Sequence, residues 1–294
     1  MALIKALPAE TKAALTRRSN AAGLRHLALY LGAIALCMLG IAVKVPLWPV
    51  LMLPLGILLV FLFTLSHECT HKTPFRTAWL NDLMGHLCAV VIALPFIWFR
   101  YFHLAHHKWT NDPERDPELE HGPRPGTFGQ WLLYLSGWGY WRGMIRTLWL
   151  NASGRITADY LPPRRHRAMR IEARLLLVIY ALAGFSLFWS PLVLWLWLVP
   201  VLLGQPFLRA YLLAEHGLCP PVANMLENSR TTFTNRIVRF LAWNMPYHAE
   251  HHAFPNVPFH QLAAFHTLTR AHLRATSHGY SAFTADYVRH LNQP

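Results

Sequence analysis

The sequence predicts an all-α integral membrane protein of one domain, residues 1–294, with four transmembrane helices in two hairpins, interfacial helices and a cytosolic cap rich in histidine. Three observations predict this fold class. Of the 294 residues, 54% are hydrophobic and only 14% are charged, whereas a soluble domain carries about 25% charged residues. Four apolar runs are long enough to cross a bilayer. The positive charges gather on one side of these runs.

Each predicted span is close to the roughly 20 apolar residues that a bilayer requires. The first hairpin turns at Lys44 to Pro46, and the second turns at Ser190 and Pro191. The four spans are residues 26–43, 47–66, 170–189 and 192–214. An even number of spans places both ends of the chain on the same side of the membrane.

The distribution of Lys and Arg predicts the orientation. Five of these residues lie in 1–25, thirteen in 66–170 and seven in 205–294, against one in the first hairpin turn and none in the second. Because positive loops stay in the cytosol, we expect the basic N-terminus, the C-terminus and every histidine cluster there. The net charge of +13 then suits lipid headgroups and an acidic protein partner, and not nucleic acid. The excess of Arg over Lys, 22 to 5, is typical of a GC-rich bacterial genome, so we expect a bacterial inner membrane.

The segment 79–99 is apolar enough to be taken for a further span. If it crossed, the histidine clusters before and after it would lie on opposite sides of the membrane and could not share a site. The segment also contains Asn81, Asp82 and His86. We therefore predict a helix that dips into the membrane or lies at its interface. Aromatic side chains mixed with arginine predict a second interfacial segment: Trp131, Tyr134, Trp138, Tyr140, Trp141 and Trp149.

Eight histidines form three short clusters, each after a long apolar segment. Their spacings of i, i+3 and i+4 place the imidazoles of a cluster on one face of a helix. Imidazole suits iron, zinc, copper or nickel, and eight ligands are too many for one ion and about right for two. The clusters are His67 and His71; His103, His106 and His107; and His248, His251 and His252.

A ninth candidate ligand, His216, closes the fourth span. It shares a helical stripe with Gln205, Arg209 and Leu212, and an ionisable stripe at the inner end of a span usually faces a cavity. The alternative is that His216 snorkels to the interface or caps the helix. We expect His86 in the core or in support of the site. The other histidines have polar or basic neighbours and are expected to be solvated: His26, His121, His166, His260, His266, His272, His278 and His290.

Acidic residues accompany the clusters. A ligating histidine normally gives its second ring N–H to a carboxylate or a carbonyl, which fixes its tautomer. We assign this supporting role in catalysis to Glu68, Glu215 and Glu250. Asp112 and Asp116 are candidates for the same role or for capping the turn in which they lie.

These motifs resemble those of the membrane fatty acid desaturase/hydroxylase superfamily over about residues 40–270. Residues 67–71 are similar to its first histidine box, residues 99–113 to its second with the flanking sequence, and residues 244–258 to its third, which is the most specific stretch. The resemblance implies four spanning helices, a cytosolic cap with two non-haem irons, and O2-dependent attack on unactivated C–H bonds.

Two departures from the family pattern bear on the reaction. Residues 215–218, Glu-His-Gly-Leu, are more similar to the motif of alkane hydroxylases than to the asparagine-containing motif of stearoyl-type enzymes, so desaturation and hydroxylation both stay open. The sequence also lacks the His-Pro-Gly-Gly motif of a fused cytochrome b5 domain. We expect electrons from a separate carrier, a ferredoxin, rubredoxin or cytochrome b5 with its reductase, whose acidic surface would complement the basic cytosolic face.

We therefore expect a diiron oxidoreductase of the fatty acid desaturase or hydroxylase type, acting on a fatty acyl chain or another amphiphile in an apolar tunnel between the hairpins. Alternatives are a hydroxylase or oxygenase of a hydrocarbon, a carotenoid or a small nitrogenous metabolite. Residues 67–71 also fit the HExxH motif of zinc proteases, with Glu68 as general base, but five or more clustered histidines would then have no role. A metal transporter would need polar residues through the bilayer depth, and the spans carry few.

Overall fold

The computed structural model describes residues 2–120 and 122–292, and most of them are helical, as the sequence predicts. The helices of the first half are α1 (Ala2–Ala6), α2 (Ala9–Leu15), α3 (Asn20–Ala42), η1 (Trp48–Leu51), α4 (Met52–Thr70), α5 (Ala78–Ile92), α6 (Phe96–Trp109), α7 (Phe128–Leu135) and α8 (Trp138–Ser153). The helices of the second half are η2 (Pro163–Arg165), α9 (His166–Ser186), η3 (Leu194–Leu198), α10 (Val199–His216), α11 (Met225–Asn228), α12 (Arg236–Leu241), α13 (His248–Ala253), η4 (Phe259–Gln261), α14 (Leu262–Thr269), η5 (Arg270–His272) and α15 (Tyr280–His290). Two short strands, β1 (Thr231–Thr232) and β2 (Thr276–Ser277), pair in parallel.

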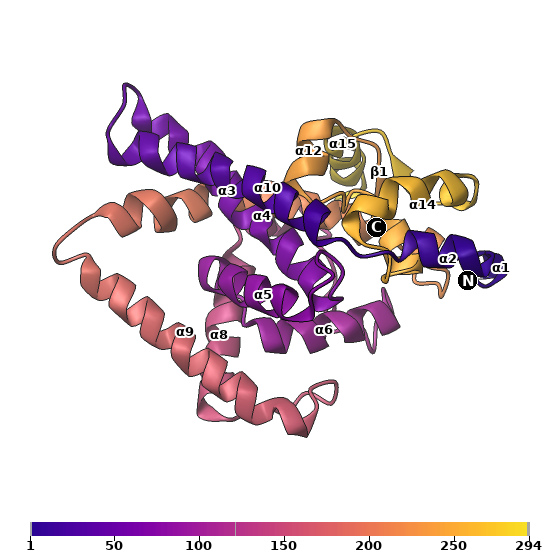
Figure 1. The fold of residues 1–294 in the computed structure, drawn as a ribbon, viewed down its shortest axis with the longest axis horizontal. Helices are drawn as coiled ribbons and strands as arrows, with labels where there is room; N and C mark the ends of the chain where they lie inside the picture. The colour runs from indigo at the N-terminus through magenta and orange to yellow at the C-terminus, as the bar shows by residue number, and fades with distance from the viewer. Residues whose placement is uncertain (1, 121, 293–294) are drawn as a thin grey trace.

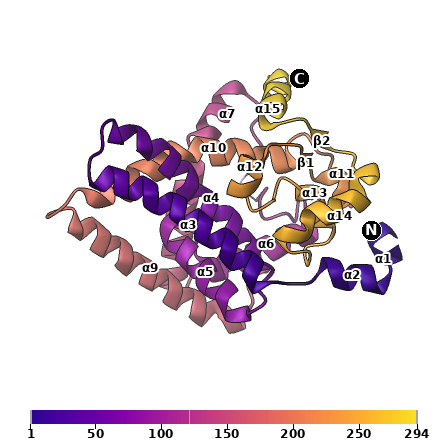
Figure 2. The same ribbon diagram turned by 45° about the horizontal axis from the view of Figure 1, so that its top comes forward.

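The long apolar helices and the short C-terminal helices occupy different ends of the molecule. In Figures 1 and 2, α3, α4 and α9 extend towards one end, and the yellow segments α13 and α14 gather at the other. The N-terminal helices α1 and α2 lie beside these C-terminal segments. The ends of α4 and α10 that carry His67 and His216 lie on the side of α13, because histidines of these three helices gather at one place.

Three helical stretches are long and apolar enough to cross a membrane: Ala9–Ala42, Trp48–Thr70 and Leu194–His216. They correspond to the predicted spans 26–43, 47–66 and 192–214. The first helix begins earlier than predicted, inside the basic segment 1–25, because the hydroxyl of Ser19 accepts the N–H of Ala22 (3.2 Å) and caps α3 there.

The predicted span 170–189 corresponds to α9, which is not among these three stretches because Arg170, Glu172 and Arg174 lie in its first half. The outer face of α9 exposes a row of large apolar side chains, which is typical of a surface that contacts lipid or another protein. These side chains are Ile171, Leu175, Val178, Leu182 and Phe185. The count of four spans stays a prediction.

The segment 79–99 folds as a bent pair, in which α5 and α6 meet at 101°. Ala93 ends α5 with a left-handed backbone (φ 55°), and Pro95, just before α6, cannot continue the first helix. Arg100 of α6 donates to Asp82 of α5 (2.6 Å) and to the carbonyl of Cys69 in α4 (3.1 Å). These bonds hold α6 beside α5 and the end of α4; that the segment dips without crossing stays a prediction.

Helices α4 and α10 touch backbone to backbone. A Cβ atom at Gly56 would lie 2.0 Å from the carbonyl oxygen of Pro200, and one at Gly204 would lie 2.3 Å from the carbonyl oxygen of Gly56. Only glycine permits so close an approach of two helices. The contact fixes the ends of α4 and α10, and with them His67 and His216, relative to each other.

The predicted aromatic interfacial segment folds as α7 and α8. Thr127 and Gln130 form a capping box at the start of α7. Trp138 and Trp149 are exposed on α8, and the hydroxyl of Tyr140 donates to the carbonyl of Ile92 at the end of α5. This bond ties α8 to the bent pair.

Arg230 connects the end of α10 to the C-terminal segments. Its guanidinium donates to the carbonyls of Ala214 (3.1 Å) and Gly217 (2.5 Å), which the end of the helix leaves without partners. The N–H of Thr232 donates to the carbonyl of Pro246, just before α13 (2.9 Å). These bonds position α13 against the end of α10.

Candidate metal centre

The nine predicted histidines meet at one place, although they come from four segments of the chain: the end of α4, α6, the end of α10, and α13. Eight of them form two groups, in each of which the potential ligand atoms lie within 4.8 Å of one another. The second group contains His106, His216 and His252, and His248 lies beside it, with its Nε2 atom 3.0 Å from that of His216. The first group contains His67, His71, His103, His107 and His251.

The helical spacing explains the division into two groups. On α6, His103 and His107 are one turn apart and face the first group, while His106 faces the second. On α13, His251 belongs to the first group and His252 to the second. The rings of His107 and His252 stack with 4.0 Å between centres, so the two groups are adjacent.

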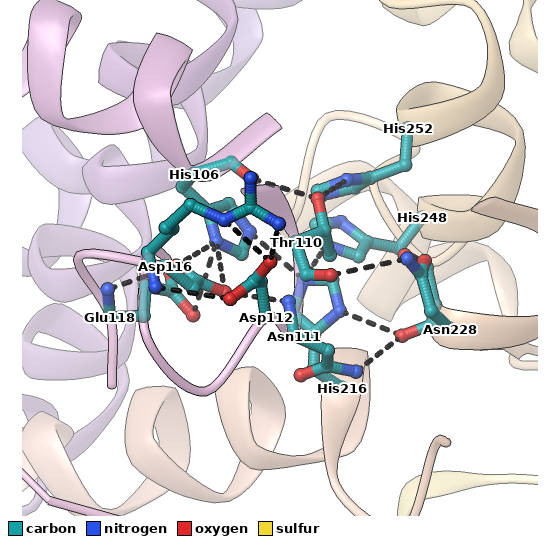
Figure 3. Close-up of polar contacts among 12 residues, drawn as sticks. His106, Thr110, Asn111, Asp112, Asp116, Glu118, His216, Asn228, His248 and His252 are labelled. Carbon is teal, nitrogen blue, oxygen red and sulfur yellow. Dashed lines mark hydrogen bonds and ion pairs between the residues drawn. The ribbon is translucent and has the colours of Figure 1, made fainter. Parts of the chain in front are cut away.

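In the second group and at His248, each ring has its Nδ1 atom next to a protein oxygen, and the Nε2 atoms of His106 and His248 lie 3.1 and 3.0 Å from that of His216 (Figure 3). The oxygens are those of Asp116 at His106 (2.9 Å), Thr110 at His252 (3.1 Å), the Asn228 carbonyl at His216 (3.2 Å) and Glu215 at His248 (3.2 Å). Such partners orient a ligating imidazole and set its tautomer.

Asp116 is the most completely bonded of these partners. It also accepts the backbone N–H groups of Asn111 (2.7 Å) and Glu118 (3.0 Å). Burial acts to raise the pKa of Asp116, but the hydrogen bond and charge of His106 and these N–H groups hold it below its ordinary value. Asp116 is therefore an anion that supports His106.

Asn228 is a supporting residue that the sequence analysis missed. Its carbonyl faces His216 and also accepts the side-chain amide of Asn111 (2.8 Å). Its own side chain donates to the carbonyls of Thr110 (3.3 Å) and Val222 (2.8 Å). A single asparagine in a loop carries no periodicity or spacing, so no sequence signal pointed to it.

Several ring nitrogens of the centre are buried without a hydrogen-bond partner in the described part of the chain. They are both nitrogens of His67, His107 and His251, and Nε2 of His252. Buried polar atoms without partners cost free energy, and bound metal ions would satisfy them. A donor set of imidazoles alone fits a transition metal such as iron.

The protonation states of His71, His251 and His252 favour metal binding. Burial lowers the pKa of His251 and His252 well below the usual range, and neighbouring imidazoles lower it further. Burial, with a smaller contribution from Arg100, lowers the pKa of His71 to about 3. These rings are neutral near neutral pH, which is the form that binds metal.

Two of the three predicted glutamates face the centre, and the third does not. Glu68 lies 3.5 Å from Nδ1 of His251, and Glu215 contacts His248 as described above. Glu250, in contrast, bonds to Thr231 and to the ring of His266. It turns away because it lies on the side of α13 that packs on β1 and α14, so it braces the cap.

Among the other polar residues, Asp112 follows the turn-capping alternative, whereas His266 and His26 differ from expectation. Asp112 caps its own turn and pairs with Arg115 (2.5 Å), so only Asp116 supports a ligand. His266 is held by Glu250, and His26 packs against Phe240 with its Nε2 2.9 Å from the carbonyl of that residue. Both rings are partly buried by residues that are distant in the sequence or in another segment. Their polar sequence neighbours therefore gave no indication of this burial. His121 lies outside the described residues.

A cavity of about 570 Å³ lies beside the centre. Its lining nearest the histidines includes Phe63, Phe99, Leu212 and Glu215, and the ring of Phe99 is 5.6 Å from that of His103, between centres. The expected tunnel lay between the hairpins. This cavity is bounded by Phe63 of α4 and by residues of α6, α8, α10 and the loop 117–125, so both predicted hairpins contribute to its wall.

Comparisons with known proteins agree with this geometry. The family model described as "Fatty acid desaturase" matches residues 13–284. An sn-1 oleoyl-lipid 12-desaturase of Arthrospira platensis is 28% identical over 235 residues, which cover 73% of this chain and 66% of that protein. A dihydrorhizobitoxine desaturase of Bradyrhizobium elkanii is 27% identical over 269 residues, which cover 83% and 74%.

A third relative matches over a shorter stretch. An sn-1 acyl-lipid omega-3 desaturase (ferredoxin) of Nostoc sp. (strain 36) is 36% identical over 69 residues, which cover 24% of this chain and 19% of that protein. The chain thus spans just under two thirds of the Arthrospira relative and about a fifth of the Nostoc relative.

Proposed function

Because the chain belongs to the fatty acid desaturase family and has helices long enough to span a membrane, we propose that it is a membrane oxidoreductase. In this proposal it introduces a double bond into an amphiphilic substrate, with O2 and external electrons. The carrying observation is the pair of adjacent imidazole groups, one of them with every Nδ1 atom next to a protein oxygen.

We assign two irons to the centre. When bound, the irons supply activation of O2 and removal of hydrogen from an unactivated C–H bond. One would be held by His67, His71, His103, His107 and His251, and the other by His106, His216, His248 and His252.

The chain itself has three tasks in this reaction. Asp116, Glu68 and Glu215 orient ligating rings, since a carboxylate beside Nδ1 fixes the tautomer of an imidazole. Phe63 and Phe99 form an apolar wall between the cavity and the histidines, which excludes water and holds the reacting carbon near the centre. The protein thereby selects which C–H bond is attacked.

The atoms balance for either outcome. Desaturation takes one hydrogen from each of two adjacent carbons, and O2, with two electrons from the carrier and two protons from solvent, leaves as two waters. Hydroxylation uses the same electrons and protons but leaves one oxygen in the product as an alcohol and releases one water. The names of the three relatives support desaturation, while the Glu215-His216 motif makes hydroxylation the second candidate.

The geometry counts against a zinc protease. Glu68, its would-be general base, accepts the hydroxyl of Thr73 (3.0 Å) and the N–H of Phe259 (3.1 Å) and faces His251. Both hydrogen bonds are made to one oxygen of Glu68, and the other oxygen lies 3.5 Å from Nδ1 of His251. Imidazoles from three separate clusters also crowd around His67, where a protease needs one or two further ligands.

We further propose that the histidine end faces the cytosol of a bacterium and receives electrons from an acidic carrier. The positive charge of the loops on that side supports both statements. The Nostoc relative is named as a ferredoxin enzyme, which supports a ferredoxin as the first carrier to test.

The test is turnover by the purified protein in lipid nanodiscs with iron, O2, ferredoxin and its reductase, and the products are identified by mass spectrometry of the lipids and added amphiphiles. Loss of two hydrogens from a substrate supports desaturation, and gain of one oxygen supports hydroxylation. His251→Ala should abolish either product, whereas His290→Ala, on the exposed face of α15, should not. Undiminished turnover by His251→Ala would contradict the proposal.

A further inference from the structure

Arg209 carries a positive charge into the cavity and forms no direct ion pair within the described part of the chain. It lies half-buried on α10 and lines the cavity together with Leu212 and Glu215. Its Nε atom is buried without a hydrogen-bond partner, and no carboxylate of residues 2–120 and 122–292 forms an ion pair with it. A charge withdrawn from water without a partner costs free energy, so this position favours an anion in the cavity.

Two aromatic rings hold the guanidinium in place. Its carbon lies 4.7 Å from the ring centre of Tyr140 and 5.9 Å from that of Tyr134. The hydroxyl of Tyr140 is anchored on the carbonyl of Ile92, so this ring is fixed. Cation–π contacts stabilise the charge but leave the N–H groups of arginine free to donate, which preorganises Arg209 to bind an anion.

The carboxylates that line the cavity have other direct partners or lie exposed. Glu215 faces Nδ1 of His248 (3.2 Å), and Glu118 lies 3.8 Å from Nδ1 of His106. Glu120 is exposed. The other cations that line the cavity are Arg124, Arg146 and Arg155, and they add to the positive potential. The charge left over in the cavity is therefore positive, next to an apolar wall.

We propose that Arg209 anchors the acidic headgroup of the substrate, and that this substrate is an anionic amphiphile with a carboxylate or phosphate at the end of a hydrocarbon chain. Arginine matches both groups because its planar fork donates two parallel hydrogen bonds. Arg209 precedes His216 by seven residues, about two helical turns or roughly 10 Å along α10. The attacked carbon then lies well along the chain, not beside the headgroup.

This inference rests on the proposed function, because it takes the cavity as the substrate site. Binding of ligand to metal-free protein tests the role of Arg209 separately from the oxidoreductase activity. Calorimetric titration of the full chain in a neutral detergent would compare decanoate, decyl phosphate and methyl decanoate. The variants are Arg209→Gln and Arg209→Lys. Arg142→Gln is the matched control, since Arg142 is exposed on α8 and does not line the cavity.

We expect wild type to bind an anion more tightly than the methyl ester. Arg209→Gln should lower the affinity for the anion by about 10-fold to 100-fold and leave the affinity for the ester unchanged. Arg209→Lys should retain part of the affinity, and Arg142→Gln all of it. Preference for decanoate over decyl phosphate would assign a free carboxylate, and the reverse a phosphate headgroup. Equal binding of ester and anions by wild type would overturn the proposal without any variant. If anion binding depends on Arg209 but the iron-loaded protein oxidises no substrate, the role of Arg209 in binding the headgroup is supported and the proposed oxidoreductase function is refuted.

Discussion

Replacing Asp116 by Asn should weaken one metal site and spare the other. Both oxygens of Asp116 lie within hydrogen-bond distance of Nδ1 of His106, at 2.9 and 3.1 Å. An amide in this place keeps the size of the side chain but loses the negative charge and one acceptor. Because His106 belongs to the second group of histidines only, the first group should keep its ion.

The magnitude follows from the role of the carboxylate. Loss of such a partner typically lowers metal affinity about 10-fold to 100-fold, which corresponds to about 1.4–2.8 kcal/mol at 1.4 kcal/mol per tenfold. One of the N–H groups of Asn111 and Glu118 also loses its acceptor, so a small loss of thermal stability should accompany the effect.

The assay is removal of iron by a competing chelator, followed as iron retained per chain. Wild type should release its two irons together, and Asp116→Asn should release one early and the other at the wild-type chelator concentration. Asp112→Asn is the control, since it removes the same charge from the same loop but has Arg115 as its partner. Release from Asp116→Asn that matches wild type, or an equal effect of Asp112→Asn, would refute the reasoning.

Three further substitutions test the framework. His216→Ala should lower the iron content towards one per chain, measured by elemental analysis. An unchanged iron content would show that His216 is not a ligand and would favour the alternative that it caps the helix. Gly56→Ala should lower thermal stability by about 1–3 kcal/mol or more, since the new methyl group would meet the backbone of α10, whereas Gly184→Ala, with nothing within 4 Å, should be neutral or stabilising. Glu172→Gln should cost about 1–3 kcal/mol, because Glu172 accepts the first N–H groups of α6 (3.0 and 2.9 Å); an unchanged melting temperature would show that this cap is dispensable.

The ligand candidates could be predicted because their signal is local. Spacings of three and four residues place imidazoles on one helix face whatever the rest of the chain does. His216 stands alone in the sequence, but its stripe with Arg209 pointed towards a cavity, and the structure puts Arg209 in the cavity and His216 in the centre. The bent pair could be anticipated for a similar reason, since only a returning segment brings His103 to His67.

The supporting residues could not be assigned in the same way. Asp112 and Asp116 differ by four positions in one loop, and only the fold decides which reaches a histidine. Glu250 sits between ligands, yet the packing of β1 and α14 turns it outward. Asn228 acts partly through its backbone carbonyl, which any residue type could supply. The close contact of Gly56 with α10 could not be foreseen either, because two isolated glycines do not reveal it in advance.

Metal analysis of the detergent-purified protein tests the central claim most directly. The protein would be expressed with iron-57 and examined by elemental analysis and Mössbauer spectroscopy. Two adjacent groups of imidazoles predict about two irons per chain with a high-spin non-haem signal. One zinc per chain, with iron absent even after growth in iron-supplemented medium, would contradict the account and leave the second group of histidines without a role.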